Sequence, residues 1–356
     1  MKQGFHQLKV IQKSNETADA AAFYFEIPEN IASDFEYTAG QYLTFEVEVN
    51  GENVRRSYSL CTAPGIDVNP GVAVKRVEDG RMSNWMNDKL NEGDIIEVMP
   101  PNGKFTVIPD GNRTQHYVLW AGGSGITPMM GIAKTLLEKE PSSTLSLVYA
   151  NRDQNSVIFK NAWDDLAKAN SDRLKIFYSY DKAPLTWFGL KGFLNADKVQ
   201  NILKQKIKVP MDQSEHYICG PGGMMEAVKQ GLNNAGAPSE KVHTEYFSAP
   251  TEKKEVEALE PAEFDGTSQI TLNVFGDTHT VPCDQNTTVL NAAMKKGINP
   301  PYSCTVGVCT TCRAKVHKGE LHMLEREGLS DDEIEQGYVL TCQSVPRSSE
   351  VEITFE

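Results

Sequence analysis

Four cysteines in the C-terminal part of the sequence have the spacing of iron-sulfur ligands. Cys304, Cys309 and Cys312 form a Cys-x4-Cys-x2-Cys pattern, and Cys342 follows thirty residues later. Four thiolates with this spacing are a ligand set of a [2Fe–2S] cluster. Gly307, between the first two ligands, lets the loop take a positive φ and turn its amide groups toward sulfur. A four-cysteine zinc site is the alternative, but zinc ribbons usually supply two Cys-x2-Cys knuckles, and this chain has one.

A second group of residues has side chains suited to a flavin nucleotide. Arg56, Ser57, Tyr58 and Ser59 lie on one strand-like run, and the alternation of a strand places Arg56 and Tyr58 on the same face. A guanidinium can pair with a pyrophosphate, and a phenol ring can lie against a tricyclic flavin. A half-exposed strand surface is the alternative interpretation of these residues.

A Gly-Arg-Met-Ser sequence comes after this strand and strengthens the flavin interpretation. Gly80, Arg81, Met82 and Ser83 precede or open a helix expected from about Ser83 to Leu90. We expect Ser83 or a neighbour to cap this helix, leaving the N–H groups of its first turn to attract an anion. An ordinary capped surface helix is the alternative, but the two motifs together favour a flavin.

Two glycine-rich turns end apolar strands in the middle of the chain. The first contains Gly122, Gly123, Gly125, Thr127 and Pro128, and the second contains Cys219, Gly220 and Pro221. The first also opens a helix, whose N–H groups and dipole suit a pyrophosphate. Because parallel strands present their carboxyl ends at one edge of a sheet, we expect both turns to border one crevice. A small buried strand-end residue is the alternative for Cys219.

The residues after the second strand of the predicted parallel sheet bear on the choice of nicotinamide coenzyme. Arg152, which follows that strand, could meet the 2′-phosphate of NADPH, whereas NADH would favour an acidic group near the ribose. Asp153 is adjacent. The sequence therefore leans slightly to NADPH, with NADH and a solvated surface arginine as alternatives.

The elements that would position these residues divide the chain into three predicted domains and a linker. Residues 1–111 alternate short strands with turns, which is typical of an antiparallel β-barrel. Residues 112–248 alternate strands and helices, which predicts a parallel sheet in an α/β domain. Residues 249–268 are acidic and contain Pro and Gly, as in a linker. Residues 269–356 contain a hairpin, a helix ending at Gly297 and the cysteine cluster.

Composition excludes several classes of function. The 356 residues include 35 basic and 48 acidic side chains, for a net charge of −13, which is the wrong balance for binding a nucleic-acid backbone. No apolar run is long enough to span a membrane, and the N-terminus has no export signal, so we expect a cytoplasmic protein without membrane insertion. Seven cysteines, an odd number, argue against a disulfide framework. Cys283 lies outside the cluster pattern and is expected to be a buried thiol.

These motifs together resemble the ferredoxin-NADP reductase family. The resemblance rests on RxYS at 56–59, GxxS at 80–83, GxGxxP at 123–128 and CGP at 219–221, and the segment 269–356 resembles a plant-type ferredoxin domain. It implies a multidomain protein with an FAD-binding β-barrel, an α/β nucleotide-binding domain and an α+β domain of the β-grasp type. Some relatives with a C-terminal ferredoxin use FMN instead of FAD.

The resemblance also implies roles for particular residues. Tyr58 would stack on the flavin ring, Ser59 would lie near its N5, and the backbone around Val74 and Lys75 would contact the ring edge. Cys219 would lie beside the nicotinamide. Phe247, in a terminal E-x-F sequence, would approach the flavin edge that the nicotinamide reaches; a plain buried aromatic residue is the alternative there.

Three such groups on one chain predict an electron relay. A nicotinamide gives up two electrons together and a [2Fe–2S] cluster accepts one at a time, so a flavin is needed between them. The domain order resembles the reductase components of bacterial multicomponent oxygenases, especially those of phenylacetyl-CoA epoxidase and steroid hydroxylase systems. The acceptor implied is a terminal oxygenase or epoxidase component of the diiron or Rieske type. A fatty-acid desaturase or a hybrid-cluster protein as acceptor, and a redox sensor, are the alternatives.

Overall fold

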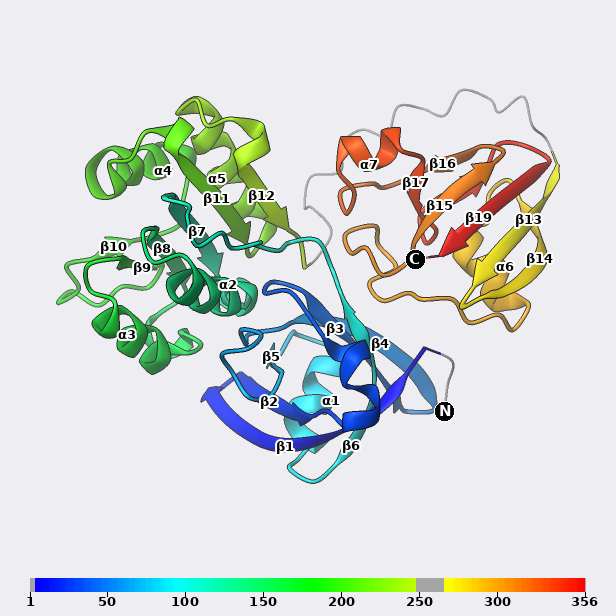
Figure 1. Ribbon diagram of the computed structural model, residues 1–356, viewed down its shortest axis with the longest axis horizontal. Coiled ribbons are helices and arrows are strands. Elements are labelled where there is room, and N and C mark those ends of the chain that lie inside the picture. The colour runs from blue at the N-terminus through cyan, green and yellow to red at the C-terminus, as the bar shows by residue number, and fades with distance from the viewer. Residues whose placement is uncertain (1–3, 248–265, 356) are drawn as a thin grey trace. The chain divides into compact units, whose positions relative to one another are not determined.

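The computed structural model describes residues 4–247 and 266–355 (Figure 1). The chain forms two compact units, Gln7–Phe247 and a smaller one made of Met1–His6 and Ser248–Glu356. Both glycine-rich turns and the RxYS strand lie in the larger unit, and the four clustered cysteines lie in the smaller one. The predicted linker 249–268 falls outside the described residues as far as position 265.

The first part of the larger unit is the predicted antiparallel barrel. Its six strands lie in the order β4-β3-β6-β1-β2-β5, and a bridge from Leu60, directly after β4, to Val72 on β5 joins the two edges of the curled sheet. Apolar side chains such as Phe23, Phe25 and Phe45 fill the interior and are fully buried. The strands are β1 (His6–Thr17), β2 (Ala20–Glu26), β3 (Tyr42–Val49), β4 (Glu52–Ser59), β5 (Gly71–Lys75) and β6 (Ile95–Asn102), and helix α1 (Arg81–Lys89) follows β5.

The second part of the larger unit is the predicted parallel sheet. Six strands in the order β10-β9-β8-β7-β11-β12 pair in parallel throughout. They are β7 (His116–Gly122), β8 (Thr144–Asn151), β9 (Leu174–Tyr180), β10 (Leu190–Lys191), β11 (Ser214–Cys219) and β12 (Val242–Glu245). Strand order reverses beside β7, the strand that carries the first glycine-rich turn. This is the position at which open α/β sheets bind ligands.

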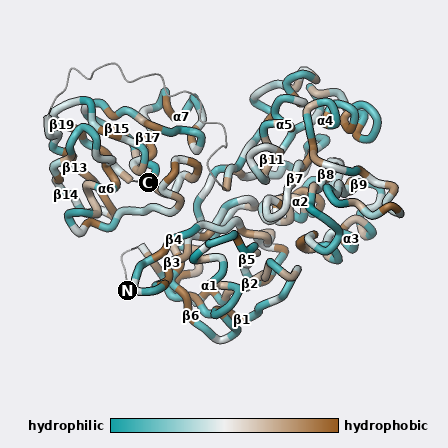
Figure 2. The backbone as a smooth tube through the Cα atoms, turned by 180° about the vertical axis from the view of Figure 1, so that it is seen from behind, coloured by the Kyte–Doolittle hydropathy of each residue, from teal (hydrophilic) through white to brown (hydrophobic). Residues whose placement is uncertain are grey.

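Helices cover this sheet. They are α2 (Ile126–Lys139), α3 (Lys160–Ala169), α4 (Ala196–Ile202), which continues as one π-turn, and α5 (Gly222–Asn234). Helix α2 is buried along most of its length, whereas hydrophilic residues, drawn teal, are frequent along α3 and α4 (Figure 2). The sequence predicts α2, α3 and α5 but not α4.

The smaller unit contains the ferredoxin-like segment. Its five-stranded sheet has the order β14-β13-β19-β15-β17, and a separate pair joins β16 and β18. The strands are β13 (Thr267–Val274), β14 (Asp277–Asp284), β15 (Arg313–Lys318), β16 (Leu321–Met323), β17 (Tyr338–Leu340), β18 (Ser344–Pro346) and β19 (Glu350–Phe355), with helices α6 (Val289–Lys295) and α7 (Asp331–Glu335). Gly297, two residues after α6, has φ +78°, as its predicted role at the helix end requires.

Among the described residues, no helix combines the length and the apolar composition needed to cross a membrane.

Candidate functional site

The four clustered cysteines come together in the smaller unit. The thiols contact one another in two pairs, Cys304 with Cys309 and Cys312 with Cys342, and Cys304 also meets Cys342. Hydrogen bonds from Cys309 and Cys342 hold the pKa of the Cys304 thiol well below its usual range. A dinuclear cluster with four cysteine ligands has two thiolates for each iron, so the paired arrangement fits a [2Fe–2S] core.

The loop around these thiols has the backbone that an iron-sulfur core needs. Gly307 has φ +82° and Thr305 has φ +60°, so the chain turns sharply between the first two cysteines. The Val306 N–H donates to the Cys304 sulfur at 3.5 Å, as predicted for amides that face the cluster. Gln343, next to Cys342, donates to the Thr305 carbonyl at 2.9 Å and holds the loop in place.

Strand β4, at one edge of the curled sheet, carries the predicted flavin-binding residues. Tyr58 is half-buried, with its ring centroid 6.0 Å from that of Phe45, and Arg56 is exposed. Ser57 faces the other side of the strand, where its hydroxyl lies 2.8 Å from that of Thr44. The arginine and the tyrosine therefore share one face, as the alternation predicts, and only the backbone of Ser57 is on hand for a ligand at that face.

At the predicted anion site, helix α1 begins earlier than the sequence suggested. The helix starts at Arg81 with Gly80 as its N-cap, because the Ser83 hydroxyl accepts from the Val77 N–H at 3.2 Å and braces the preceding turn instead of capping the helix. A Cβ on Gly80 would lie 2.5 Å from the Ser83 oxygen. Asn84 makes the first intrahelical bond, to the Gly80 carbonyl, so the N–H groups of residues 81–83 point out of the helix end, where an anion binds well.

The two glycine-rich turns lie against each other, as predicted. Strands β7 and β11 are paired, and a Cβ on Gly125 would come within 2.1 Å of the Cys219 carbonyl oxygen. One on Gly220 would come within 2.9 Å of the Gly122 nitrogen. Gly123 has φ +52°. Thr127 and Pro128 lie in the first turn of α2, where the Thr127 hydroxyl donates to the Ser124 carbonyl at 3.0 Å and Pro128 costs no helix bond.

The carboxyl group of the terminal E-x-F sequence, for which no role is predicted, joins the two halves of this unit. Glu245 is the last residue of β12, directly beside Cys219 on β11, and it accepts a hydrogen bond from the Ser59 hydroxyl of the barrel at 2.9 Å. Burial raises the pKa of Glu245 to about 8, although the Ser59 bond opposes the rise. Burial is the main cause that raises the pKa of the Cys219 thiol, and the neighbouring Glu245 carboxyl raises it further. These three residues bring the predicted flavin strand and the predicted nicotinamide strand into contact.

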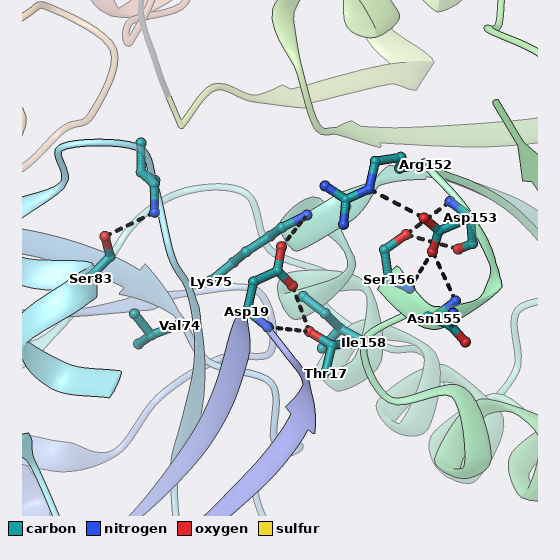
Figure 3. A network of polar contacts seen from close by, with 12 residues as sticks. Thr17, Asp19, Val74, Lys75, Ser83, Arg152, Asp153, Asn155, Ser156 and Ile158 are labelled. Carbon is teal, nitrogen blue, oxygen red and sulfur yellow. Dashed lines mark hydrogen bonds and ion pairs between the residues drawn. The ribbon is translucent and has the colours of Figure 1, made fainter. Parts of the chain in front are cut away.

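Two cationic side chains, those of Lys75 and Arg152, extend toward the same region of the larger unit (Figure 3). Lys75 on β5 lies 3.8 Å from Asp19, and its Nζ is 3.7 Å from where a Cβ on Gly123 would stand. Arg152, after β8, pairs with Asp153 at 3.3 Å, while the Asp153 carboxylate caps the following turn. The two cationic side chains extend from the two halves of the unit into the same region, which suits a ligand carrying phosphates. Val74 is fully buried.

The remaining predicted residues differ in exposure. Phe247 is 43% exposed, whereas its neighbour Tyr246 is buried and donates to Glu226. Met82, in the first turn of α1, is buried. Cys283 is buried and donates to the Thr287 carbonyl at 3.1 Å, in accord with a structural thiol.

Comparison with known proteins identifies the family. Models of the oxidoreductase FAD-binding domain, the oxidoreductase NAD-binding domain and the 2Fe-2S iron-sulfur cluster binding domain match residues 7–107, 119–230 and 272–347. The chain is 34% identical to one component of the 1,2-phenylacetyl-CoA epoxidase of Escherichia coli (strain K12), over 99% of this chain and 98% of the relative. It is 36% identical to the ferredoxin reductase component of 3-ketosteroid-9-alpha-monooxygenase of Mycolicibacterium smegmatis, over 98% and 97% of the two chains.

A solved structure shows the same architecture. Phthalate dioxygenase reductase superposes with a TM-score of 0.60 at 27% identity, covering 99% of this chain and 98% of that one. The three matched domains account for FAD, NAD(P)H and a [2Fe–2S] cluster, and the sites above fit these groups. The chain therefore belongs to the ferredoxin-NADP reductase-like oxygenase reductases with a C-terminal plant-type [2Fe–2S] ferredoxin domain, and it is an NAD(P)H-dependent oxidoreductase of electron transfer.

Proposed function

We propose that this reductase supplies electrons to a phenylacetyl-CoA epoxidase of the diiron type. The observation that carries this proposal is the match to a component of such an epoxidase along nearly the whole of both chains. A steroid hydroxylase is the second candidate acceptor, because the match to a steroid monooxygenase reductase is of similar extent. The two candidates are distinguished by incubating the reductase and NAD(P)H with each purified terminal component. Turnover of phenylacetyl-CoA by the epoxidase, without turnover of a steroid by the hydroxylase, supports the epoxidase as acceptor. The reverse result overturns the proposal.

The site residues have complementary tasks in this proposal. Bound FAD would supply the chemistry that converts the electron pair of NAD(P)H into single electrons for the iron-sulfur cluster. Tyr58 would hold the flavin ring, and Arg56 with the start of α1 would hold its phosphates. The hydrogen bond from Ser59 to Glu245 supports placing the ring next to Cys219, where the nicotinamide would lie. No residue needs to form a covalent bond with a substrate.

A cysteine variant tests the order of the relay. Cys309→Ser should lower reduction of the protein acceptor at least 100-fold, because the cluster loses a ligand, yet leave NAD(P)H-dependent reduction of a dye that accepts electrons from flavin within about threefold. Cys283→Ser is the matched control, since Cys283 is a buried thiol of the same unit outside the ligand set. Equal loss of both activities in Cys309→Ser contradicts the order NAD(P)H, FAD, cluster, acceptor.

Charge supports a basic docking surface on the acceptor. From residue 249 onward the chain has 18 acidic and nine basic side chains, so the ferredoxin segment with its linker holds most of the net negative charge. Opposite charges on two proteins speed their encounter, and salt screens the effect. Raising the ionic strength should therefore slow acceptor reduction but not dye reduction. Insensitivity of acceptor reduction to salt would remove this part of the proposal.

A further inference from the structure

Helix α2 touches the barrel at a point that leaves no room for a side chain. Gly131 lies in the middle of this helix, and a Cβ there would stand 2.6 Å from the Thr62 carbonyl oxygen and 3.6 Å from that of Leu60. The shorter of these distances is well inside van der Waals contact with a backbone atom. Glycine costs about 1 kcal/mol relative to alanine inside a helix, so its use here fits a requirement for close approach.

An ion pair one turn along α2 fixes the same contact. Lys134 Nζ lies 2.8 and 3.0 Å from the two carboxylate oxygens of Asp67, and both side chains are about three-quarters buried. Asp67 also accepts from the Ala63 N–H at 2.7 Å, so the pair holds the backbone of the loop after β4 and not only its surface. Partial burial shields such a pair from the screening that weakens exposed ones.

The barrel side of the contact is itself rigid. The Thr62 hydroxyl lies 2.8 Å from that of Tyr37 and accepts from the Gly71 N–H at 3.2 Å. The loop is thus tied to β5 and to the segment before β3. A displacement of α2 cannot be absorbed by the loop without breaking these bonds.

The two segments that meet at this contact, the loop after β4 and helix α2, directly follow the residues predicted to bind the flavin and the nicotinamide. The loop at Leu60–Thr62 continues from Tyr58 and Ser59, and α2 continues from the turn that ends at Gly125. Reacting groups must approach to about 3–3.5 Å, and an error of about 1 Å can cost 10²-fold in rate. We propose that the contact of Gly131 with Thr62, held by Lys134 and Asp67, sets the distance between nicotinamide and flavin. This inference rests on the proposed roles of the two segments; its residues are positioning residues that touch neither cofactor.

Gly131→Ala is the direct test, because the added methyl group must move α2 away from the loop by roughly 0.5–1 Å to reach ordinary contact. In the FAD-loaded protein we expect the rate constant for flavin reduction by NAD(P)H to fall about 10- to 100-fold, with coenzyme Kd changed less than threefold. A second readout needs no turnover: the long-wavelength absorbance that arises when a bound nicotinamide contacts the flavin should weaken at saturating coenzyme. Gly111→Ala is the matched control, since a Cβ there would meet only the Lys139 carbonyl oxygen, at an ordinary distance of 3.6 Å.

Lys134→Met keeps the proposal testable where Gly131→Ala does not fold. It removes the ion pair but not the close packing, and we expect a smaller loss, about three- to tenfold, in the same rate constant with Kd unchanged. A wild-type rate and absorbance in both variants, or a loss confined to thermal stability or coenzyme Kd, overturns the inference. Failure of the proposed function looks different, because the wild-type flavin would still be reduced by NAD(P)H while phenylacetyl-CoA would not be turned over with the epoxidase.

Discussion

Replacement of Glu245 by glutamine should change how the stability of the larger unit depends on pH. The pKa of this carboxyl is raised from 4.5 to about 8, chiefly by burial. Between these values the unfolded chain has an ionised Glu245 and the folded chain a protonated one, so unfolding releases a proton and wild-type stability falls as pH rises. The contribution is fully present below about pH 4.5 and is lost as pH passes about 8.

The size of the effect follows from the shift. At 1.36 kcal/mol per pKa unit the limit is about 5 kcal/mol. Because Glu245 is only partly buried, we expect about 2 kcal/mol. Glutamine can still accept the Ser59 hydrogen bond and does not titrate. In the FAD-loaded protein, the Tm advantage of Glu245→Gln over wild type should therefore be about 4–8 °C larger at pH 8.5 than at pH 5. Ser59→Ala removes the bond that favours the carboxylate and should extend the wild-type decline to higher pH. Parallel Tm curves for wild type and Glu245→Gln would refute the reasoning.

Three further substitutions test the other parts of the site. Arg152→Gln should lower kcat/KM for NADPH about tenfold, the worth of one charged hydrogen bond, with little change for NADH; equal losses would show that Arg152 does not meet a 2′-phosphate. Gly307→Ala places a Cβ at φ +82°, a strain of about 1–2 kcal/mol, and should reduce iron and sulfide per chain after reconstitution; full loading would contradict the need for glycine. Gly125→Ala meets the Cys219 carbonyl at 2.1 Å and should destabilise by about 3 kcal/mol, seen as a lower Tm, whereas Gly223→Ala should leave Tm nearly unchanged.

Local motifs could be read from the sequence, and contacts between distant segments could not. The cysteine spacing and the glycine-rich turns encode their own backbone geometry, so the sequence predicts the paired thiols and the two facing turns. Glu245 belongs to the E-x-F sequence, but its bond with Ser59 was not predicted, because Ser59 is 186 residues away. The start of α1 was misplaced because Ser83 bonds the turn before the helix. Helix α4 was missed because it has only seven residues, of which Val199 and Ile202 are buried.

The division of the chain into two units follows from what each step of the relay demands. Transfer from nicotinamide to flavin needs atoms in near contact, and the larger unit provides this by direct bonds between its halves, from Ser59 to Glu245 and from Lys134 to Asp67. Passing single electrons onward involves no transfer of an atom, so it does not require the cluster to share that rigid body. Cys304, Cys309, Cys312 and Cys342 lie in a unit with its own core. Substitutions at the contact between α2 and the barrel should therefore slow flavin reduction without changing the spectrum or the potential of the cluster, and a shift in either would show that the two steps are coupled through the fold.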